Sequence, residues 1–320
     1  MLMKIIGTGS ALPSLAVTND MLSVFLDTSD EWIRTRTGIV ERRIISDENL
    51  KDLAIEASQK ALDQAGIKGE DLDYIICSNV VNYYVTPSLS CLIAGGINAA
   101  CACADLNAAC SGFVYALEMA QLYIDTGKAT NILVVCAEEP TRMCSWKDRN
   151  TAVLFGDGAA AAVVTKGESF KASMLTAKHR PEILYYQRPL EECPFVKTTQ
   201  RGVPMHMNGK EVFKMAVTAS LEGIRYVLDK TGMTADQVDH YICHQANMRI
   251  LEAIRTHLQQ PKEKFPHNIE RLGNTSSATI PILLDELNRE GRLKEGDTVL
   301  LSGFGAGFTA GTCLFTWVEA

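Results

Sequence analysis

Hydrophobic and polar residues follow the same pattern twice along this chain. Residues 62–77 read LDQAGIKGEDLDYIIC and residues 228–243 read LDKTGMTADQVDHYIC, with six of sixteen positions identical and no gap at an offset of 166. In the stretch before each copy, NLKDLAIEASQKA and EVFKMAVTASLEGIRYV, apolar or small residues return every three or four positions. That period predicts a helix with one buried face, and the short β-branched run that ends each copy predicts a buried strand.

The repetition continues further along the chain. The segment NILVVCAEE, from Asn131, matches TVLLSGFGAG, from Thr298, near the same offset. A period of about 166 residues is far longer than the roughly 20 to 50 residues of a solenoid repeat. We therefore predict a duplicated α/β fold whose halves, residues 1–166 and 167–320, each contain a largely buried sheet covered by helices and pack across a pseudo-twofold axis. A cleft between such halves is the natural place for a site.

Length and composition limit the possible classes of protein. A chain of 320 residues with 47% hydrophobic content can bury a large core. Its first residues, MLMKIIGTGSALP, predict a strand and a turn rather than a signal peptide, and no stretch approaches the roughly 18 apolar residues that span a bilayer. We expect a compact cytoplasmic protein that does not associate with membranes.

Cysteine usage and charge exclude further classes. Most of the ten cysteines lie in apolar runs and none forms a C-x-x-C pair, which favours reduced thiols over disulfides. The CAC stretch at 101–103 lacks neighbours at ligand spacing, so we expect no metal site. A formal net charge of -7 argues against broad nucleic-acid binding, although it permits a local basic patch.

The repeat also places three chemically capable side chains at related positions. Cys110 lies where the small residues of DLNAACSGFVYAL meet a predicted helix, His244 directly follows the second repeated strand, and Asn274 lies within two residues of the position equivalent to Cys110. Strand and loop ends related by the axis can converge, which predicts a Cys/His/Asn site. Taken singly, each residue also has a structural explanation, as a buried thiol, a structural or surface histidine, or a turn residue.

The surroundings of Cys110 suit a nucleophile. A thiol near a helix start lies in the positive end of the helix dipole, and a nearby imidazole further favours the thiolate. We therefore expect Cys110 to be activated and able to accept an acyl group. Its neighbours Ala108, Ala109, Ser111 and Gly112 leave room for close backbone approach.

Several short motifs, in order along essentially the whole chain, resemble β-ketoacyl-acyl carrier protein synthase III, a thiolase-fold family of condensing enzymes that start bacterial fatty-acid synthesis. They are DEWIRTRTGIVERR at 30–43, AACSGF at 108–113, FGDGAAAAVV at 155–164, HMNGKEVFK at 206–214, HQANMRI at 244–250, GNTSSATIP at 273–281 and GFGAGFT at 303–309. The resemblance implies a five-layer α-β-α-β-α fold with pseudo-twofold symmetry, and a homodimer.

The resemblance also implies a reaction, a ping-pong Claisen condensation. Cys110 would take an acyl group from a coenzyme A thioester, with acetyl-coenzyme A as the expected primer, and malonyl-acyl carrier protein would lose carbon dioxide and attack the acyl-enzyme. Hydrogen bonds from His244 Nε2 and the Asn274 amide would stabilise the enolate, and the backbone N–H groups of Cys110 and Gly305 would form the oxyanion hole. Coenzyme A enters as a substrate thioester, and no separate cofactor is expected.

By the same resemblance, further residues would contact the substrate. Trp32 and Arg149 would sandwich the adenine, Arg36 and Arg249 would meet phosphates, Asn208, Gly209 and Asn247 would hold the pantetheine arm, and Phe304 would lie near the thiol. Ordinary packing is the competing explanation for Trp32 and Phe304.

An acidic carrier protein needs a local positive face on a chain that is itself acidic. Lys210, Lys214, Arg249 and Arg255 supply one candidate, and a solvated helix face is the competing explanation for these charges.

Related activities remain open at this point. The segment 81–107 is less familiar than its surroundings, and in the resembling family that region lines the acyl pocket, so the choice of primer is open, as is a starter role in polyketide or quinolone synthesis. The stretch SNVVNYY at 78–84 lacks the glutamate that a hydroxymethylglutaryl-coenzyme A synthase requires. A type III polyketide synthase also uses Cys, His and Asn on this fold, but such chains are usually longer and have different flanks around the nucleophile. A cysteine thioester hydrolase and a non-catalytic scaffold are also compatible with the sequence.

Overall fold

The computed structural model describes residues 3–190, 194–195 and 202–319. Two sheets form the frame of the molecule. The first has the strand order β1-β7-β6-β4-β5 and the second the order β11-β12-β13-β8. Their strands are β1 Met3–Ala11, β4 Tyr74–Ser78, β5 Ala102–Leu106, β6 Ile132–Glu138, β7 Gly158–Lys166, β8 Phe170–Ala177, β11 His240–Cys243, β12 Thr298–Gly305 and β13 Thr309–Thr316.

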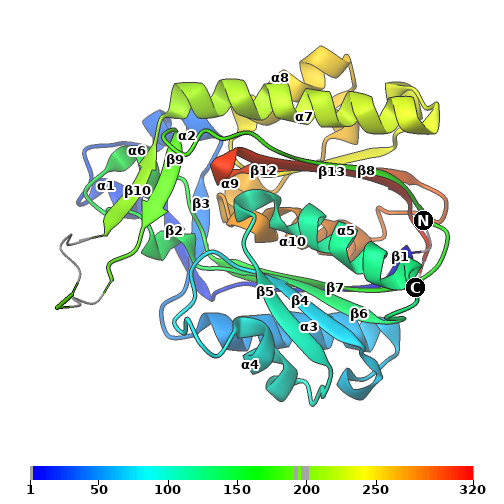
Figure 1. The fold of residues 1–320 in the computed structure, drawn as a ribbon. Helices are drawn as coiled ribbons and strands as arrows, with labels where there is room; N and C mark the ends of the chain where they lie inside the picture. The colour runs from blue at the N-terminus through cyan, green and yellow to red at the C-terminus, as the bar shows by residue number, and fades with distance from the viewer. Residues whose placement is uncertain (1–2, 191–193, 196–201, 320) are drawn as a thin grey trace.

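Helices cover both sheets and fill the space between them, which gives five layers (Figure 1). One outer layer contains α3 Leu50–Ala65 and α4 Leu89–Gly96, the middle layer α5 Gly112–Asp125 and α10 Thr279–Arg289, and the other outer layer α7 Gly209–Thr231 and α8 Met248–Leu258. The predicted thiolase-like α-β-α-β-α fold is confirmed.

The smaller elements flank this frame beside the middle layer. They are β2 Leu15–Thr18, α1 Asn19–Ser23, α2 Asp30–Thr37, β3 Glu41–Ile44, α6 Arg149–Ala152, β9 Leu184–Gln187, β10 Val203–Met207 and α9 Ile269–Leu272. Short 3₁₀ turns lie at η1 Gly69–Asp71, η2 Ala109–Ser111, η3 Pro140–Arg142, η4 Ala235–Gln237, η5 Lys262–Lys264, η6 Ser276–Ala278 and η7 Ala306–Phe308.

The repeat in the sequence corresponds to a repeat in the structure. In each sheet a parallel pair, β4 with β6 or β11 with β12, continues through antiparallel strands, β7 and β1 or β13 and β8. The sheets differ at one edge, because β5 has no counterpart in the second sheet and α9 lies at the corresponding place in the chain. The boundary expected between residues 166 and 167 falls in the loop that joins β7 to β8.

The repeated helices end in the same way. A left-handed glycine, Gly66 in one copy and Gly232 in the other, closes α3 and α7 with a φ of 66°. Glycine is favoured there because other side chains meet steric cost at positive φ. Their buried faces follow the predicted period, as in α3, where Leu50, Leu53, Ala54 and Ala57 are buried.

The helix α3 packs closely on β1 where the two elements cross. A Cβ atom on Gly7 would overlap the Ala61 carbonyl oxygen, and one on Gly9 would overlap that of Ala57. Glycine is therefore required for the helix to lie directly on the strand. None of the helices in the described part of the chain is long and apolar enough to cross a membrane.

Candidate active site

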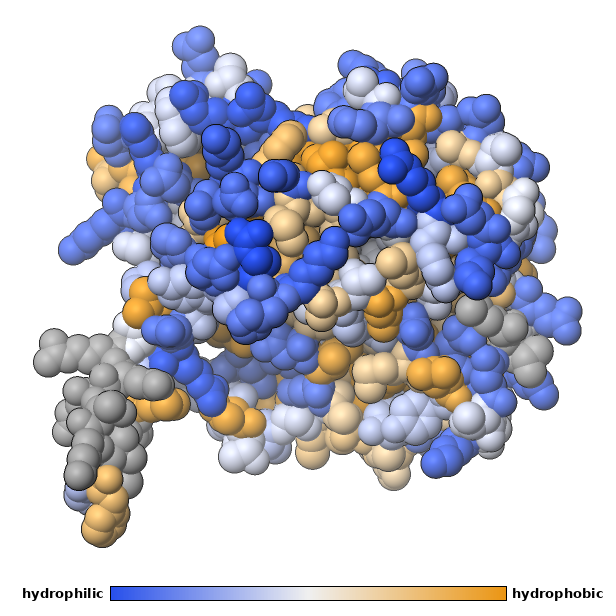
Figure 2. Space-filling view, turned by 45° about the horizontal axis from the view of Figure 1, so that its top comes forward, coloured by the Kyte–Doolittle hydropathy of each residue, from blue (hydrophilic) through white to orange (hydrophobic). Residues whose placement is uncertain are grey.

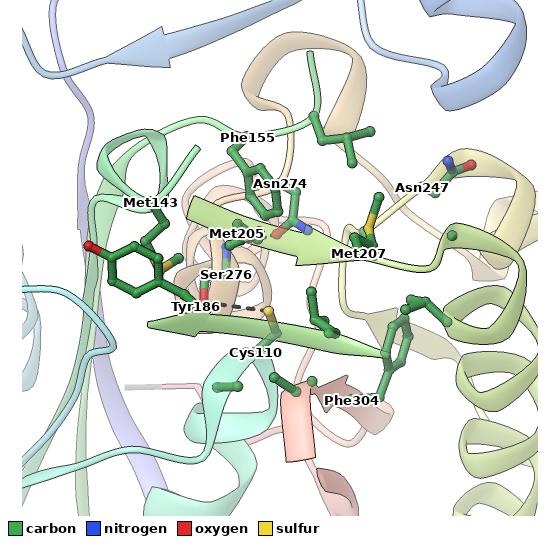
Figure 3. A pocket seen from close by; sticks show the side chains of 18 of the residues that line it. Cys110, Met143, Phe155, Tyr186, Met205, Met207, Asn247, Asn274, Ser276 and Phe304 are labelled. Carbon is green, nitrogen blue, oxygen red and sulfur yellow. Dashed lines mark hydrogen bonds between the residues drawn. The ribbon is translucent and has the colours of Figure 1, made fainter. Parts of the chain in front are cut away.

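Cys110, His244 and Asn274 line one cavity of about 1470 Å³. Cys110 lies in η2 at the start of α5, His244 follows β11, and Asn274 lies between α9 and η6. The pseudo-twofold arrangement thus brings together three side chains that are far apart in the sequence. Figure 3 shows Cys110 and Asn274 in this cavity with Ser276 beside them.

The backbone around Cys110 is shaped by two unusual positions. Ala109 has a positive φ of 46°, which turns the chain sharply just before the nucleophile. A Cβ atom on Gly305 would lie only 2.5 Å from the Cys110 backbone nitrogen. The two backbones therefore approach closely, as the expected pair of oxyanion donors requires.

Burial is the main influence on the protonation of Cys110. Burial raises the pKa of the thiol to about 12, against a lowering hydrogen bond to Ser276, and the negative charge of Glu138 raises it further. Burial thus opposes the thiolate that the helix start and the imidazole were expected to favour. The thiol is protonated at neutral pH and must lose its proton when it reacts.

His244 is a neutral hydrogen-bonding group. Its side chain is buried, and burial lowers its pKa to about 3. Nδ1 lies 2.6 Å from the Thr279 hydroxyl, and the ring meets Phe304 edge-on with 5.1 Å between ring centres. The Thr279 hydroxyl also lies 3.1 Å from the Ser276 carbonyl, to which it can donate. In the tautomer in which this hydroxyl donates to Nδ1 instead, the single proton of the neutral ring is on Nε2 and can be donated to a ligand.

Asn274 is oriented by its own turn. Its side-chain oxygen accepts a hydrogen bond from the Ser276 backbone at 2.8 Å, and its backbone nitrogen donates to the Leu154 carbonyl at 2.9 Å. With the amide oxygen occupied in this way, the NH₂ group is the donor that remains for a ligand in the cavity.

Sequence reasoning missed two groups beside the nucleophile. The Cys110 sulfur lies 3.5 Å from the Ser276 hydroxyl, which lies 3.1 Å from the carboxylate of the fully buried Glu138. A signal was present in the sequence, since Glu138 is a charged residue at the end of the apolar run ILVVCA and such a residue is rarely buried without a partner.

The expected adenine slot is closed in this structure. The guanidinium carbons of Arg36 and Arg149 lie 4.4 and 5.0 Å from the centre of the Trp32 ring. An adenine sandwiched between two planes needs about 7 Å, which is two van der Waals separations. Arg149 instead donates to the Asp27 carbonyl and carboxylate, at 2.5 and 3.2 Å, and lines a smaller hollow. An adenine sandwiched between Trp32 and Arg149, as the resemblance implies, would therefore require Arg149 to move away from the ring.

The residues expected at the pantetheine arm divide into two groups. Gly209 and Asn247 line the cavity, and Phe304 lines it near the nucleophile. Asn208 does not, because its side-chain oxygen caps α7 by accepting from the Glu211 backbone at 3.3 Å. The structure thus places Asn208 in helix capping rather than in the cavity wall.

The expected docking cations also divide. Lys210, Lys214 and Arg249 are exposed, and Lys210 and Arg249 stand at the cavity wall. Arg255 instead forms an ion pair with Glu252 at 2.8 Å and donates to the Gln260 carbonyl at 2.8 Å, so its charge is neutralised locally. Arg255 therefore contributes less to a positive face than the other three cations. Hydrophilic residues predominate on the face that carries α7 and α8 (Figure 2).

Metal chemistry was not expected from the sequence. Within residues 3–190, 194–195 and 202–319, no three His, Cys, Asp or Glu side chains are grouped so that they could hold a metal ion.

Comparisons with known proteins place this geometry in context. Residues 104–180 match the family model described as 3-oxoacyl-[acyl-carrier-protein (ACP)] synthase III, and residues 228–317 match its C-terminal model. The chain is 42% identical to the beta-ketoacyl-[acyl-carrier-protein] synthase III of Clostridium novyi, covering 98% of both chains. The crystal structure of 3-oxoacyl-[acyl-carrier-protein] synthase III from Aquifex aeolicus is 42% identical, with a TM-score of 0.91 over 98% of this chain and 100% of that one. The priming beta-ketosynthase of the R1128 polyketide pathway is 32% identical, with a TM-score of 0.93 over 99% and 97%.

Proposed function

The chain belongs to the 3-oxoacyl-[acyl-carrier-protein] synthase III family of condensing acyltransferases, and from this premise we propose the reaction that its own site performs. It joins an acyl-coenzyme A primer, with acetyl-coenzyme A as the first candidate, to malonyl-acyl carrier protein. An acyl group on Cys110 connects the two half-reactions, and the product starts fatty-acid synthesis.

In the first half-reaction the Cys110 sulfur attacks the thioester carbonyl. The electron pair of the carbonyl moves to its oxygen, where the N–H groups of Cys110 and Gly305 stabilise the negative charge. The close approach of these two backbones supports that role. Collapse of the tetrahedral intermediate expels coenzyme A as a thiolate and leaves the acyl group on sulfur.

In the second half-reaction the malonyl thioester loses carbon dioxide. Negative charge develops on the thioester oxygen, and His244 Nε2–H and the Asn274 NH₂ group donate hydrogen bonds to it. Because burial keeps His244 neutral, the site provides donors without a fixed positive charge. The carbanion then attacks the acyl-cysteine, and Cys110 departs as a thiolate.

The convergence of Cys110, His244 and Asn274 on one cavity is the observation that carries this proposal. The size of the cavity, about 1470 Å³, also suits the long pantetheine arm that both substrates share.

Intact-mass measurement after exposure to a panel of acyl-coenzyme A thioesters tests the first half-reaction. We expect an acyl adduct in the native protein and none in Cys110→Ala. Addition of malonyl-acyl carrier protein should then yield a ketoacyl product, whereas free acid alone would indicate a thioester hydrolase. The absence of any adduct across the panel would contradict the proposal.

The second half-reaction is tested by the variants Asn274→Ala and Asn274→Asp. Both should keep the acyl adduct and lose condensation, by roughly 100-fold or more when one enolate donor is removed. Asn274→Asp should lose more, because its carboxylate repels the developing negative charge. Equal acylation and condensation losses in Asn274→Ala would contradict the assigned role.

The pathway served by the product is open to a primer test. The similarity to a priming beta-ketosynthase from a polyketide pathway makes a starter role in secondary metabolism the second candidate. A preference for acetyl-coenzyme A favours fatty-acid synthesis, and a strong preference for longer or branched primers favours the second candidate.

Assembly and location are further parts of the proposal. We place the enzyme in the cytoplasm, since the nine cysteines described by the structure are all free thiols. We also propose a homodimer formed through β5, because this strand ends the order of the first sheet and an edge strand can pair with a second copy. Carrier protein would dock at Lys210, Lys214 and Arg249. Sedimentation or light scattering tests the dimer.

A further inference from the structure

We propose that Glu138 is a positioning residue for Cys110, and that the Ser276 hydroxyl relays the thiol proton to its carboxylate during acyl transfer. This inference rests on the proposed function, because it explains how a protonated thiol becomes the nucleophile.

The three groups form one continuous chain of contacts. The Cys110 thiol donates to Ser276 Oγ at 3.5 Å, and the Ser276 hydroxyl donates to Glu138 Oε1 at 3.1 Å. The second carboxylate oxygen accepts from the Val80 backbone N–H at 3.0 Å, which fixes the orientation of the carboxylate. Each donor thus points from the nucleophile toward the acid, the direction in which a proton must leave the sulfur.

The backbone holds the relay in place. Ser276 has a positive φ of 54°, as Ala109 does next to the nucleophile at 46°. These two strained turns, η6 and η2, are related by the internal repeat and begin α10 and α5. Strain of this kind persists where the surrounding structure requires it. Here the two strained turns place the Ser276 hydroxyl beside the Cys110 thiol.

Proton transfer through this chain balances over the reaction cycle. When the Cys110 sulfur bonds to the acyl carbon, its proton passes to Ser276 Oγ as the Ser276 proton passes to Glu138. The carbon–sulfur bond to coenzyme A breaks, and the departing thiolate takes a proton from water. The hydroxide that this leaves in solvent is consumed by the carbon dioxide released in the second half-reaction, which forms bicarbonate. Glu138 stays protonated while the acyl-enzyme exists. It returns the proton through Ser276 when condensation expels Cys110 as a thiolate.

The surroundings of Glu138 suit a group that changes its protonation state. The titratable groups that face it are thiols, Cys110 from η2, Cys77 from β4 and Cys136 from its own strand. No ion pair within the described residues involves Glu138. Burial raises its pKa to about 7, against lowering hydrogen bonds from Ser277, Val80 and Ser276, so both forms are accessible near neutral pH.

Ser277 offers a matched control. Its hydroxyl donates to the same Glu138 oxygen at 2.6 Å, but its other hydroxyl contact is Ser78 at 3.1 Å rather than the nucleophile. Ser277→Ala therefore perturbs the carboxylate without interrupting the path from sulfur to acid, and Ser276→Ala interrupts it.

Alkylation of Cys110 by iodoacetamide, followed by peptide mass spectrometry from pH 5.5 to 9, tests the relay without any acyl substrate. In the native protein we expect the alkylation rate to rise near pH 7, where Glu138 ionises and can accept the thiol proton. Glu138→Gln and Ser276→Ala should slow alkylation at pH 7.5 at least tenfold and should lack this rise. Ser277→Ala should stay within threefold of the native rate and keep the rise, shifted to higher pH. Glu138→Asp, which keeps the carboxylate, should recover part of the rate.

A purely electrostatic role for Glu138 gives a different result. If Glu138 were only a nearby negative charge, Glu138→Gln would speed alkylation, because removing that charge lowers the pKa of the thiol. Such a gain, or equal losses in Ser276→Ala and Ser277→Ala, would overturn the relay. If thermal unfolding shows that Glu138→Gln is not folded, Ser276→Ala tests the same path.

Acetylation by acetyl-coenzyme A, followed as a single turnover, separates this inference from the proposed function. The relay predicts slower acetylation in Glu138→Gln, with the native protein acetylated rapidly. If the native protein is never acetylated, but Glu138→Gln and Ser276→Ala slow alkylation of Cys110 as expected, the proposed function is overturned and the relay is supported. Native-like acetylation and alkylation in both relay variants would overturn the relay alone.

Discussion

The Thr279 hydroxyl lies 2.6 Å from Nδ1 of His244, at the first residue of α10. The turn that leads into this helix also contains Asn274 and Ser276, so a single short segment positions both proposed enolate donors and contacts the nucleophile. The site therefore depends on one helix start that belongs to the second half of the chain, facing a helix start that belongs to the first.

Replacement of Thr279 tests how the imidazole proton is placed. Thr279→Val cannot donate to Nδ1, so the ring is free to carry its proton on the wrong nitrogen, and condensation should fall about 10- to 100-fold. Acylation of Cys110 should change little. Thr279→Ser keeps a hydroxyl and should recover most of the rate. Ketoacyl product formation and acyl-enzyme mass measure the two steps, and equal losses in both variants would contradict the assignment.

Replacement of Gly305 tests the backbone contact at the nucleophile. Because a Cβ atom there would lie 2.5 Å from the Cys110 nitrogen, Gly305→Ala must separate the two backbones. Single-turnover acylation should slow by roughly 100-fold or more, as for loss of an oxyanion donor. Gly95 in α4 has open space around it, and Gly95→Ala should keep the native rate. Native-like acylation in Gly305→Ala would exclude this oxyanion arrangement.

Charge reversal on α7 tests the docking surface. Lys214→Glu should raise the KM for malonyl-acyl carrier protein about five- to tenfold, because an acidic partner loses an attraction and meets a repulsion. The KM for acetyl-coenzyme A should not change, since Lys214 does not line the cavity. Lys230 lies 16 residues along the same helix, about 24 Å away, and provides the control. If Lys230→Glu has the same effect, the charge acts over the whole face and not at the proposed surface.

The buried carboxylate of Glu138 should lower stability as the pH rises. Its pKa is about 7 when folded and 4.5 when exposed, so between these values the unfolded chain ionises while the folded protein keeps the proton. The folded state therefore loses stability from pH 4.5 to 7, by up to roughly 3 kcal/mol. Glu138→Gln removes this loss, and its free energy of unfolding relative to the native protein should increase over that range. Urea unfolding at pH 5 and pH 8 measures the difference, and a constant difference would contradict the raised pKa.

Local patterning determined much of the architecture. The period of apolar residues predicted α3 and α7, and the β-branched runs predicted β4 and β11, because burial of one helix face or of a whole strand leaves a signature in consecutive residues. The offset of 166 predicted the duplication, since two copies that fold alike repeat their pattern of buried positions. The convergence of Cys110, His244 and Asn274 could be anticipated from this repeat together with family motifs.

Contacts between distant residues required the folded chain. Arg149 and Arg255 both carry a charge that could serve a ligand. In the structure Arg149 contacts Asp27, and Arg255 contacts Glu252 and a backbone carbonyl. No sequence pattern predicts these partners.

The sequence by itself therefore determined the layers, the repeat and the three candidate side chains, because these follow from local periodicity and from the order of motifs. Only the tertiary structure decided how the site is charged. The protonated thiol of Cys110, the neutral ring of His244 and the path from sulfur through Ser276 to Glu138 depend on which groups lose water together. That loss of water depends on burial at the interface between the two halves, and local sequence patterns do not predict it.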